Sequence, residues 1–410
     1  MSEWKKVKLK DCCIKIGSGS TPKGGSLVYV NSGTSLIRSQ NVYNLSFDYN
    51  GLTHITEDAA NKLKGVTVFN EDILLNITGD SVARTCIVPK EVLPARVNQH
   101  VAIIRTDRKK MNWRFLNYYL ASPKMQAHML SLAVGKGASR NAMTTQMIEN
   151  FEVPYPPLST QHRIASILSR YDSLIENYQK QIKLLEEAAQ RLYKEWFVDL
   201  RFPGHENTNI IDGVPEGWEK KKVNSIIELQ SGFAFKSSTF DDNGAYKIVT
   251  IKNVKDGAFD GDNVSRIVAI PEKMPKHCVL ADGDILLSLT GNVGRVCIVN
   301  GKNYLLNQRV AKLATDYKAF AYCLFRSRDM FIEVNNLANG AAQQNVSPIR
   351  IGEMKILLPN NELLQEFESI ARKSIARIIS LQSQLRLLTE ARDRLLPKLM
   401  SGEIEVLNEK

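Results

Sequence analysis

The chain has 410 residues, which suggests two to three domains. Its hydrophobic fraction of 43% and charged fraction of 24% are ordinary for a folded protein. The formal net charge of +11 points to a polyanionic partner, with nucleic acid as the first candidate, although charge that only maintains solubility explains it equally well. A membrane surface is disfavoured, since no run of Lys and Arg lies beside an apolar or amphipathic anchor.

The beginning of the chain contains no apolar signal region, and no apolar run approaches the length of a membrane span. The six cysteines include no Cys-x-x-Cys pattern, so a zinc or redox site is disfavoured. We therefore expect reduced, buried cysteines in a cytoplasmic protein without a metal.

The most informative pattern is an internal repeat. Residues 72–79 read DILLNITG and residues 284–291 read DILLSLTG. Asn98-Gln99 recurs as Asn307-Gln308, and Cys86 recurs as Cys297, always in the same order. Such self-similarity indicates two copies of one module, each long enough to bury a core of its own.

Each copy opens with short predicted strands separated by Gly, Asn and Asp. Shorter helices follow, and each globular part ends in a strand marked by proline. In the first copy the strands are 36–38, 73–77, 86–88, 101–104 and 151–157, with a helix at 113–121; in the second they are 248–251, 285–289, 297–299, 310–314 and 355–359, with a helix at 318–327.

The period of the apolar residues then changes to a heptad in both copies. Over 164–196 the apolar residues are separated alternately by four and three positions without interruption. The same spacing recurs over 367–399, where Arg392 is the one clear interruption. Pro397 is expected to end or kink the second helix. The pattern favours a coiled coil between the two helices, with separate packing of each helix on its own globular part as the alternative. Parallel and antiparallel pairings are both sterically open.

A catalytic role is disfavoured. The chain has no GxGxxG after a strand and no HExxH, and GSTPKGGS at 19–26 lacks a lysine at the position where a phosphate-binding loop requires it. The Asn-Pro-Pro-Tyr of an adenine methyltransferase is absent as well. Although a spatial triad stays possible, we expect a binding protein.

Polar and basic loop residues are the candidates for reading DNA, because Arg and Lys pair with guanine edges and Asn and Gln with adenine. Positions alike in both copies suggest shared docking, and positions that differ suggest readout of different bases. The alternative for single residues is structural, with the asparagines capping turns and the arginines bridging carboxylates. The predicted DNA-binding residues are Lys23, Arg38, Arg84, Asn98, Gln99, His100, Ser139, Arg140, Lys236, Lys252, Arg295, Asn307, Gln308, Arg309, Gln343 and Gln344.

The order of these features resembles a known family. A Gly-Ser-Gly-x-Thr-Pro turn at 17–22, a DILL strand, an Asn-Gln loop, a proline-ended strand and a long helix all occur, and most of them recur after the junction at 214–218. The second copy departs at 231–235, where Thr-Pro is missing. The whole chain is similar to the specificity (S) subunit of a type I restriction–modification system.

The resemblance implies an α+β chain with two tandem α/β target recognition domains, 1–157 and 203–359. A long helix follows each domain, over 158–202 and over 360–410 with the C-terminal tail. The two helices are expected to form an antiparallel coiled coil with pseudo-two-fold symmetry. In that family the subunit is not catalytic, and each domain reads half of a bipartite, asymmetric sequence in double-stranded DNA.

The resemblance also implies partners. Two methyltransferase (M) subunits and restriction (R) subunits are expected to join, and to supply the sites for S-adenosylmethionine, ATP and Mg, with no cofactor in this chain. The predicted partner-binding residues are Tyr171, Tyr178, Trp196, Phe197 and Arg392. The competing hypotheses are a stand-alone two-headed repressor, a fusion enzyme with its own catalytic domain, and a scaffold that does not bind DNA.

Overall fold

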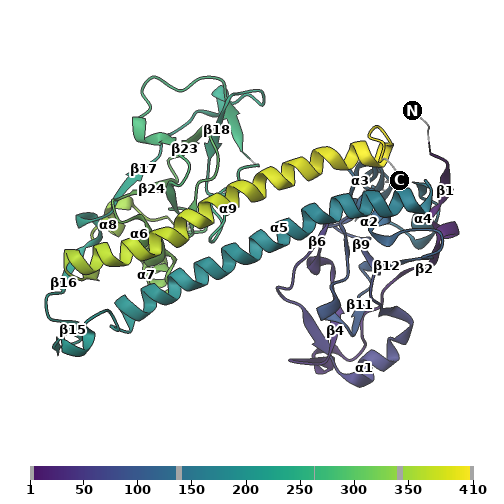
Figure 1. Cartoon of the computed structure of the whole chain (residues 1–410), viewed down its shortest axis with the longest axis horizontal. Helices are drawn as coiled ribbons and strands as arrows, with labels where there is room; N and C mark the ends of the chain where they lie inside the picture. Colours follow the sequence, from purple (N-terminus) through teal and green to yellow (C-terminus); the bar gives the residue numbers. More distant parts are fainter. Residues whose placement is uncertain (1–3, 135–140, 263, 339–344, 407–410) are drawn as a thin grey trace. The chain divides into compact units, whose positions relative to one another are not determined.

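The computed structural model describes residues 4–134, 141–262, 264–338 and 345–406. The chain forms two compact units (Figure 1). Unit 1 comprises 1–174 and 388–410, and unit 2 comprises 175–387. Each unit therefore contains one globular domain and a stretch of each of the two long helices.

Unit 1 contains two main sheets. The first is fully antiparallel, in the order β10-β9-β12-β2, and the second has the order β3-β7-β4-β11-β8, with β4 and β11 parallel. The strands of the first are β2 (Cys13–Ser18), β9 (Ile73–Asn76), β10 (Thr85–Ile87) and β12 (Val101–Thr106); those of the second are β3 (Tyr29–Val30), β4 (Thr34–Ile37), β7 (Thr53–Ile55), β8 (Thr67–Val68) and β11 (Ala95–Val97).

Unit 2 repeats this topology. Its sheets have the orders β17-β24-β21-β22 and β19-β18-β23-β20, and β18 and β23 form the matching parallel pair. The two copies predicted from the repeat thus share their strand order as well as their sequence pattern, apart from β3, which adds a fifth strand to the second sheet of unit 1. The strands are β17 (Glu228–Ser231), β18 (Tyr246–Val249), β19 (Ser265–Ile267), β20 (Val279–Leu280), β21 (Ile285–Ser288), β22 (Val296–Ile298), β23 (Tyr304–Leu306) and β24 (Val310–Ala314).

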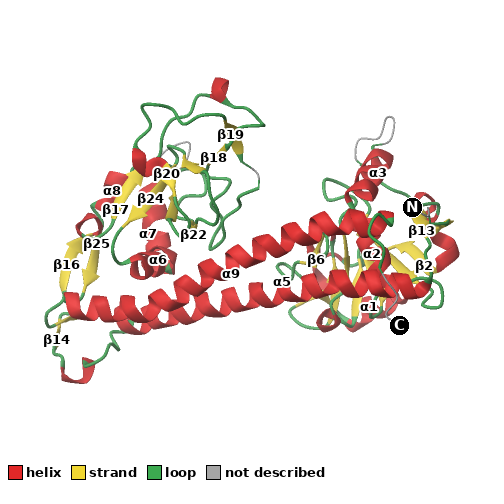
Figure 2. Ribbon diagram, turned by 45° about the horizontal axis from the view of Figure 1, so that its top comes forward, coloured by secondary structure: helices red, strands yellow, loops and turns green. Residues whose placement is uncertain are grey.

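Smaller elements complete both domains (Figure 2). Two-stranded ribbons join the start of each domain to its end: β1 (Lys6–Lys8) with β13 (Glu152–Pro154), and β16 (Glu219–Lys222) with β25 (Lys355–Leu358). The remaining pairs are β5 (Val42–Tyr43) with β6 (Ser46–Phe47), and β14 (Ile210–Ile211) with β15 (Val214–Pro215). The helices are α1 (Glu57–Lys62), α2 (Trp113–Ala121), α3 (Pro123–Ala133), α4 (Thr145–Glu149), α6 (Lys318–Arg326), α7 (Arg328–Ala338) and α8 (Pro348–Gly352).

The two heptad segments are the long helices α5 (Leu158–Tyr193), which continues through a π-helical turn at Lys194–Val198, and α9 (Asn361–Ser401). Pro397 lies in the last turn of α9, as predicted, but it does not end the helix, because α9 continues to Ser401 and stops at Gly402, whose φ is 73°. Proline removes the hydrogen bond to the carbonyl four residues earlier, and its ring crowds that carbonyl. That residue, Asp393, is exposed, so water can solvate the freed carbonyl.

Within both units a stretch of α5 packs against a stretch of α9, as Figure 1 shows. In unit 1, Arg392 bonds Asp172, with 2.9 Å between Nη1 and Oδ1. In unit 2, the rings of Trp196 and Phe367 lie 5.7 Å apart. Residue numbers fall along α9 as they rise along α5, so the coiled coil is antiparallel, as the resemblance implied.

Each long helix also caps a short helix of the globular domain it follows. Gln161 of α5 is fully buried and accepts the backbone N–H of Asn112 at 2.8 Å, next to the start of α2. Glu368 of α9 is buried and accepts the N–H groups of Ala319 and Phe320, each at 3.0 Å, at the start of α6. Unpaired N–H groups at a helix start are costly to bury, so these two side chains fix the domains to the helices.

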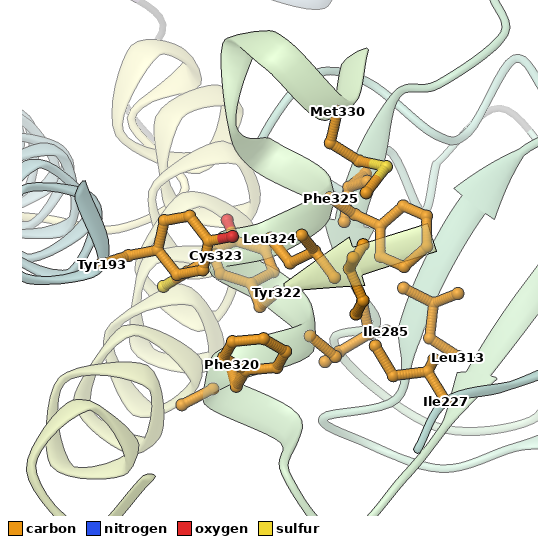
Figure 3. Close-up of a cluster of buried hydrophobic side chains, with 14 of the residues drawn as sticks. Tyr193, Ile227, Ile285, Leu313, Phe320, Tyr322, Cys323, Leu324, Phe325 and Met330 are labelled. Carbon is orange, nitrogen blue, oxygen red and sulfur yellow. The ribbon is translucent and has the colours of Figure 1, made fainter. Parts of the chain in front are cut away.

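The main core of each unit contains side chains from the domain and from both long helices. In unit 2, Tyr193 of α5 and Phe367 of α9 pack with Phe320 of α6, and the same core extends to Ile285 and Leu313 of the sheet (Figure 3). In unit 1, the core contains Leu168 of α5, Leu396 and Leu399 of α9, and Phe115 of α2.

The described cysteines are all free, and five of the six are buried. Cys86 and Cys297 are 1% and 0% exposed and fill corresponding sites in the sheets of the two domains, as the repeat predicted. Burial raises the pKa of the Cys86 thiol to about 12. The thiol therefore remains protonated and unreactive at neutral pH.

Replacing Phe367 with Ala tests the shared core of unit 2. The ring is 0% exposed, so its removal is expected to cost about 3–5 kcal/mol, measured by urea denaturation. Leu184→Ala on α5 is the control, because this side chain is 55% exposed and its loss should change stability little. Equal losses in the two variants would contradict the assignment of Phe367 to the core.

Candidate nucleic-acid interface

The Asn-Gln loop of unit 1 is held against the turn that follows β2. Gly19 donates its N–H to Val101 at 2.8 Å, and Ser20 donates to Val97 at 3.0 Å. A Cβ atom on Gly19 would lie 2.2 Å from the carbonyl oxygen of Asn98, a distance that no side chain tolerates. Only glycine permits this close approach of the two loops.

Unit 2 builds the same contact. Phe233 donates its N–H to Leu306 at 2.9 Å, and Gly232 donates to Val310 at 3.3 Å. A Cβ atom on Gly232 would lie 2.2 Å from the carbonyl oxygen of Asn307. The missing Thr-Pro in the second copy therefore leaves the packing of the two loops unchanged.

The two asparagines of the loops have a structural role in both units. Asn98 Oδ1 accepts the N–H of His100 at 3.1 Å, and Asn307 Oδ1 accepts the N–H of Arg309 at 3.3 Å. This bond to a residue two positions on is the turn-forming role of Asn, which was the structural alternative. The turns leave Gln99, Gln308 and Arg309 exposed to solvent.

The turns that follow β9 and β21 contact further loop residues in their units. Thr78 Oγ1 lies 2.7 Å from His100 Nδ1, and Thr290 Oγ1 donates to Asn345 Oδ1 at 2.9 Å. Gly79 and Gly291, next to these threonines, have φ values of 73° and 72°, so both form turns. Ser139, Arg140, Gln343 and Gln344 lie outside the described residues, which resume at Asn141 and Asn345. Asn141 accepts the N–H of Gly79 at 2.9 Å.

The other predicted DNA-binding residues differ in exposure. Lys23, Lys236 and Lys252 are exposed, and Arg295 is half-buried. Arg84 lies over the ring of Tyr43, 4.6 Å from its centroid, and bridges no carboxylate among the described residues. The Arg38 side chain is turned to its own loop and donates to the carbonyl of Gly51 at 2.7 Å, whereas the carbonyl of the preceding residue, Ile37, accepts the N–H of Asn98 at 3.0 Å.

The residues predicted from the sequence do not include Thr78 and Thr290. The Thr78 hydroxyl lies against His100 of the Asn-Gln loop, and the Thr290 hydroxyl donates to Asn345, where the described residues resume. The signal was present in the matched Thr-Gly pairs of the two copies, but nothing in the sequence named their partners. No cluster of potential metal ligands occurs within the described part of the chain.

The predicted partner-binding residues differ in accessibility. Tyr171 and Tyr178 are half-buried on α5. Trp196 and Phe197 are 6% and 8% exposed and belong to the core of unit 2. Arg392 interrupts the apolar heptad, and its charge is paired with that of Asp172 inside unit 1.

Comparison with known proteins identifies the family. A family model, the type I restriction modification DNA specificity domain, matches residues 1–187 and 215–386. The chain belongs to this family. It is 27% identical to the MjaIX specificity subunit of Methanocaldococcus jannaschii, over 98% of this chain and 94% of that protein, and 29% identical to the MjaVIII specificity subunit of the same organism, over 84% and 82%.

A solved structure shows the same fold. The S subunit of a type I restriction–modification system from M. genitalium superimposes with a TM-score of 0.61 at 16% identity, covering 97% of this chain and 96% of that one. This chain is therefore a DNA specificity subunit of a type I system, a non-catalytic subunit that assembles with M and R subunits on DNA. Subunits of this family carry no cofactor, and S-adenosylmethionine and ATP are used by the M and R subunits.

Gly19→Ala is expected to lower the melting temperature of the specificity subunit by several degrees, because the added methyl group would force the two loops apart. Thermal unfolding followed by circular dichroism measures the effect. Gly17→Ala is the matched control, since nothing lies within 4 Å of the Cβ atom it would add. A similar melting temperature for both variants would show that the loops do not need this contact.

Proposed function

We propose that this chain reads a bipartite, asymmetric sequence in double-stranded DNA and directs methyltransferase and restriction subunits to it. The observation that carries the proposal is the same loop framework in both units with a different residue next to the shared glutamine, the half-buried His100 in unit 1 and the exposed Arg309 in unit 2. Gln99 and His100 stand in one loop where Gln308 and Arg309 stand in the other. One framework with two sets of side chains suits the reading of two different half-sites.

In this proposal 1–157 and 203–359 are the target recognition domains, and 158–202 with 360–410 form the helical spacer. The residues that suit contacts with phosphate are Lys23, Lys236, Lys252, Arg84 and Arg295. Phosphate contacts from Lys and Arg position a protein on DNA and do not read bases. Arg309 suits readout of a guanine, and the exposed glutamines suit readout of adenine.

Ser139, Arg140, Gln343 and Gln344 stay in the proposed interface on the ground of sequence alone. Arg38 would act there indirectly, through its hydrogen bond to the carbonyl of Gly51.

Two M subunits are the proposed direct partners, and R subunits join through them. Tyr171 and Tyr178 are the proposed contacts, since both side chains are partly accessible on α5. Trp196, Phe197 and Arg392 would act indirectly, by shaping the helices that the partner meets. Within the described residues no helix is both long and apolar enough to cross a membrane. A cytoplasmic location is part of the proposal, because that is where chromosomal DNA lies in a bacterial or archaeal cell.

Arg309→Ala is expected to relax one half-site and leave the other unchanged. A lost bidentate contact with a base costs about 1–3 kcal/mol, whereas a lost phosphate contact weakens all sequences alike. Sequencing of methylated DNA from cells with the variant and the M subunit reports both half-sites. Lys373→Ala, an exposed change on α9, is the control. An unaltered motif with Arg309→Ala would remove this residue from the interface.

The isolated chain is expected to bind DNA weakly, and addition of the M subunit should strengthen binding to the specific sequence. The reason is that the partner adds its own DNA contacts and holds the duplex against both domains. A gel-shift titration with specific and unrelated duplexes measures both affinities. Full affinity and specificity without the partner would favour the stand-alone repressor instead.

A further inference from the structure

A polar contact joins the domain of unit 1 to both long helices. The hydroxyl of Tyr118, on α2, donates to Asp172 Oδ2 on α5. Arg392 of α9 binds the other oxygen, with 2.9 Å between Nη1 and Oδ1. The side chains of Arg392 and Asp172 are only 15% and 21% exposed. This three-residue contact is called the unit-1 anchor below.

Unit 2 contains a contact of the same chemistry. Tyr322 of α6 donates its hydroxyl to Glu186 Oε1 on α5 at 2.5 Å. Arg326 of α6 lies 3.8 Å from Glu186 Oε2, and it also pairs with Asp256 in a loop of the domain. Burial raises the pKa of the Glu186 carboxyl, while Tyr322 and Arg326 oppose that rise. This is called the unit-2 anchor.

The two anchors are not a simple consequence of the repeat. Both carboxylates belong to α5, where they are two heptads apart in the sequence and so lie on one face of the helix. Duplication alone would have placed the second carboxylate on α9. The matching position there, at the offset that relates Arg191-Leu192 to Arg394-Leu395, is Ile375, which is 5% exposed.

The ion pair of Asp172 and Arg392 is largely removed from solvent, at 21% and 15% side-chain exposure. Taking charges out of water is costly, so such a pair contributes less to stability than its Coulomb attraction suggests. Charged hydrogen bonds instead have strict geometry, whereas apolar contacts tolerate sliding and rotation. A single polar residue within the apolar contact of a coiled coil can specify the register of the paired helices.

We infer that Asp172 and Glu186 are positioning residues, each of which fixes one target recognition domain on the helices, and that together they determine which separation of the two half-sites the complex accepts. This inference rests on the proposed bipartite recognition. Neither residue touches DNA, so base readout within each half-site does not depend on them.

The test uses the complete complex of this chain with its M subunit. The methylation rate is measured on duplexes with both half-sites unchanged and the gap natural, one base pair longer or one base pair shorter. Asp172→Ala and Glu186→Ala are expected to reduce the preference for the natural gap by about fivefold or more, the scale of coupling in a shared polar network. Glu187→Ala is the matched control, because its pair with Lys183 is long, at 3.9 Å, and exposed.

Exchanging the charges of Asp172 and Arg392 gives a second, independent test. Arg392→Asp and Asp172→Arg should each relax the preference for the natural gap, and the double variant should restore it, because the pair is rebuilt in reverse. If an alanine variant fails to fold, Tyr118→Phe and Tyr322→Phe remove only a hydroxyl and are expected to relax the gap in the same direction.

An equal loss of rate at every gap, with the preference for the natural gap retained, would reduce the anchors to structural contacts and overturn the inference. The wild-type complex separates this outcome from failure of the proposed function. If it methylates no bipartite sequence at all, the proposed function fails. If it methylates one with a fixed gap that the folded variants keep, only the inference fails.

Discussion

The structure depends on the burial of α5 and α9 against each other and against the globular domains. Neither main core is made by one copy of the repeat alone. Phe115 in unit 1 packs into a core completed by Leu396 and Leu399 of the second copy, and Phe320 in unit 2 packs into a core completed by Tyr193 of the first. The two copies are therefore joined by the hydrophobic effect as well as by the chain.

This dependence has a consequence for recognition. The loops that carry Gln99 and Arg309 belong to domains whose main cores extend onto the helices, so the helices fix where each domain lies. Hydrogen bonds of defined geometry also join the long helices to the domains. Gln161 and Glu368 cap short helices, and the two anchors bind tyrosines of those same helices, α2 and α6.

The loops themselves combine a fixed backbone with variable side chains. Gly19 and Gly232 permit the same close approach in both units, and Asn98 and Asn307 form the same turn. Next to these fixed residues stand His100 in one unit and Arg309 in the other. A framework held by backbone contacts can change its exposed residues without losing its shape.

The sequence by itself determined the duplication, most of the long central strands, both long helices and the absence of recognisable catalytic motifs. These follow from local periodicity, which depends on near neighbours in the chain. It placed α2 at 113–121 correctly but missed β2, β11 and α3, whose short or mixed patterns are stabilised by distant partners. It left open whether Pro397 ends or kinks the last turn of α9, because the effect of one proline depends on whether the freed carbonyl can be solvated.

Only the tertiary structure decided the direction of helix pairing on physical grounds, since both directions satisfy the same heptads. It likewise decided that Arg392, which interrupts the apolar heptad of α9, pairs with Asp172. It also decided that the Arg38 side chain binds the carbonyl of Gly51, while Arg309 remains exposed. Such partners are separated by up to 220 positions in the chain. No local pattern encodes which of them meet, because the meeting is set by the packing of the two helices with the domains.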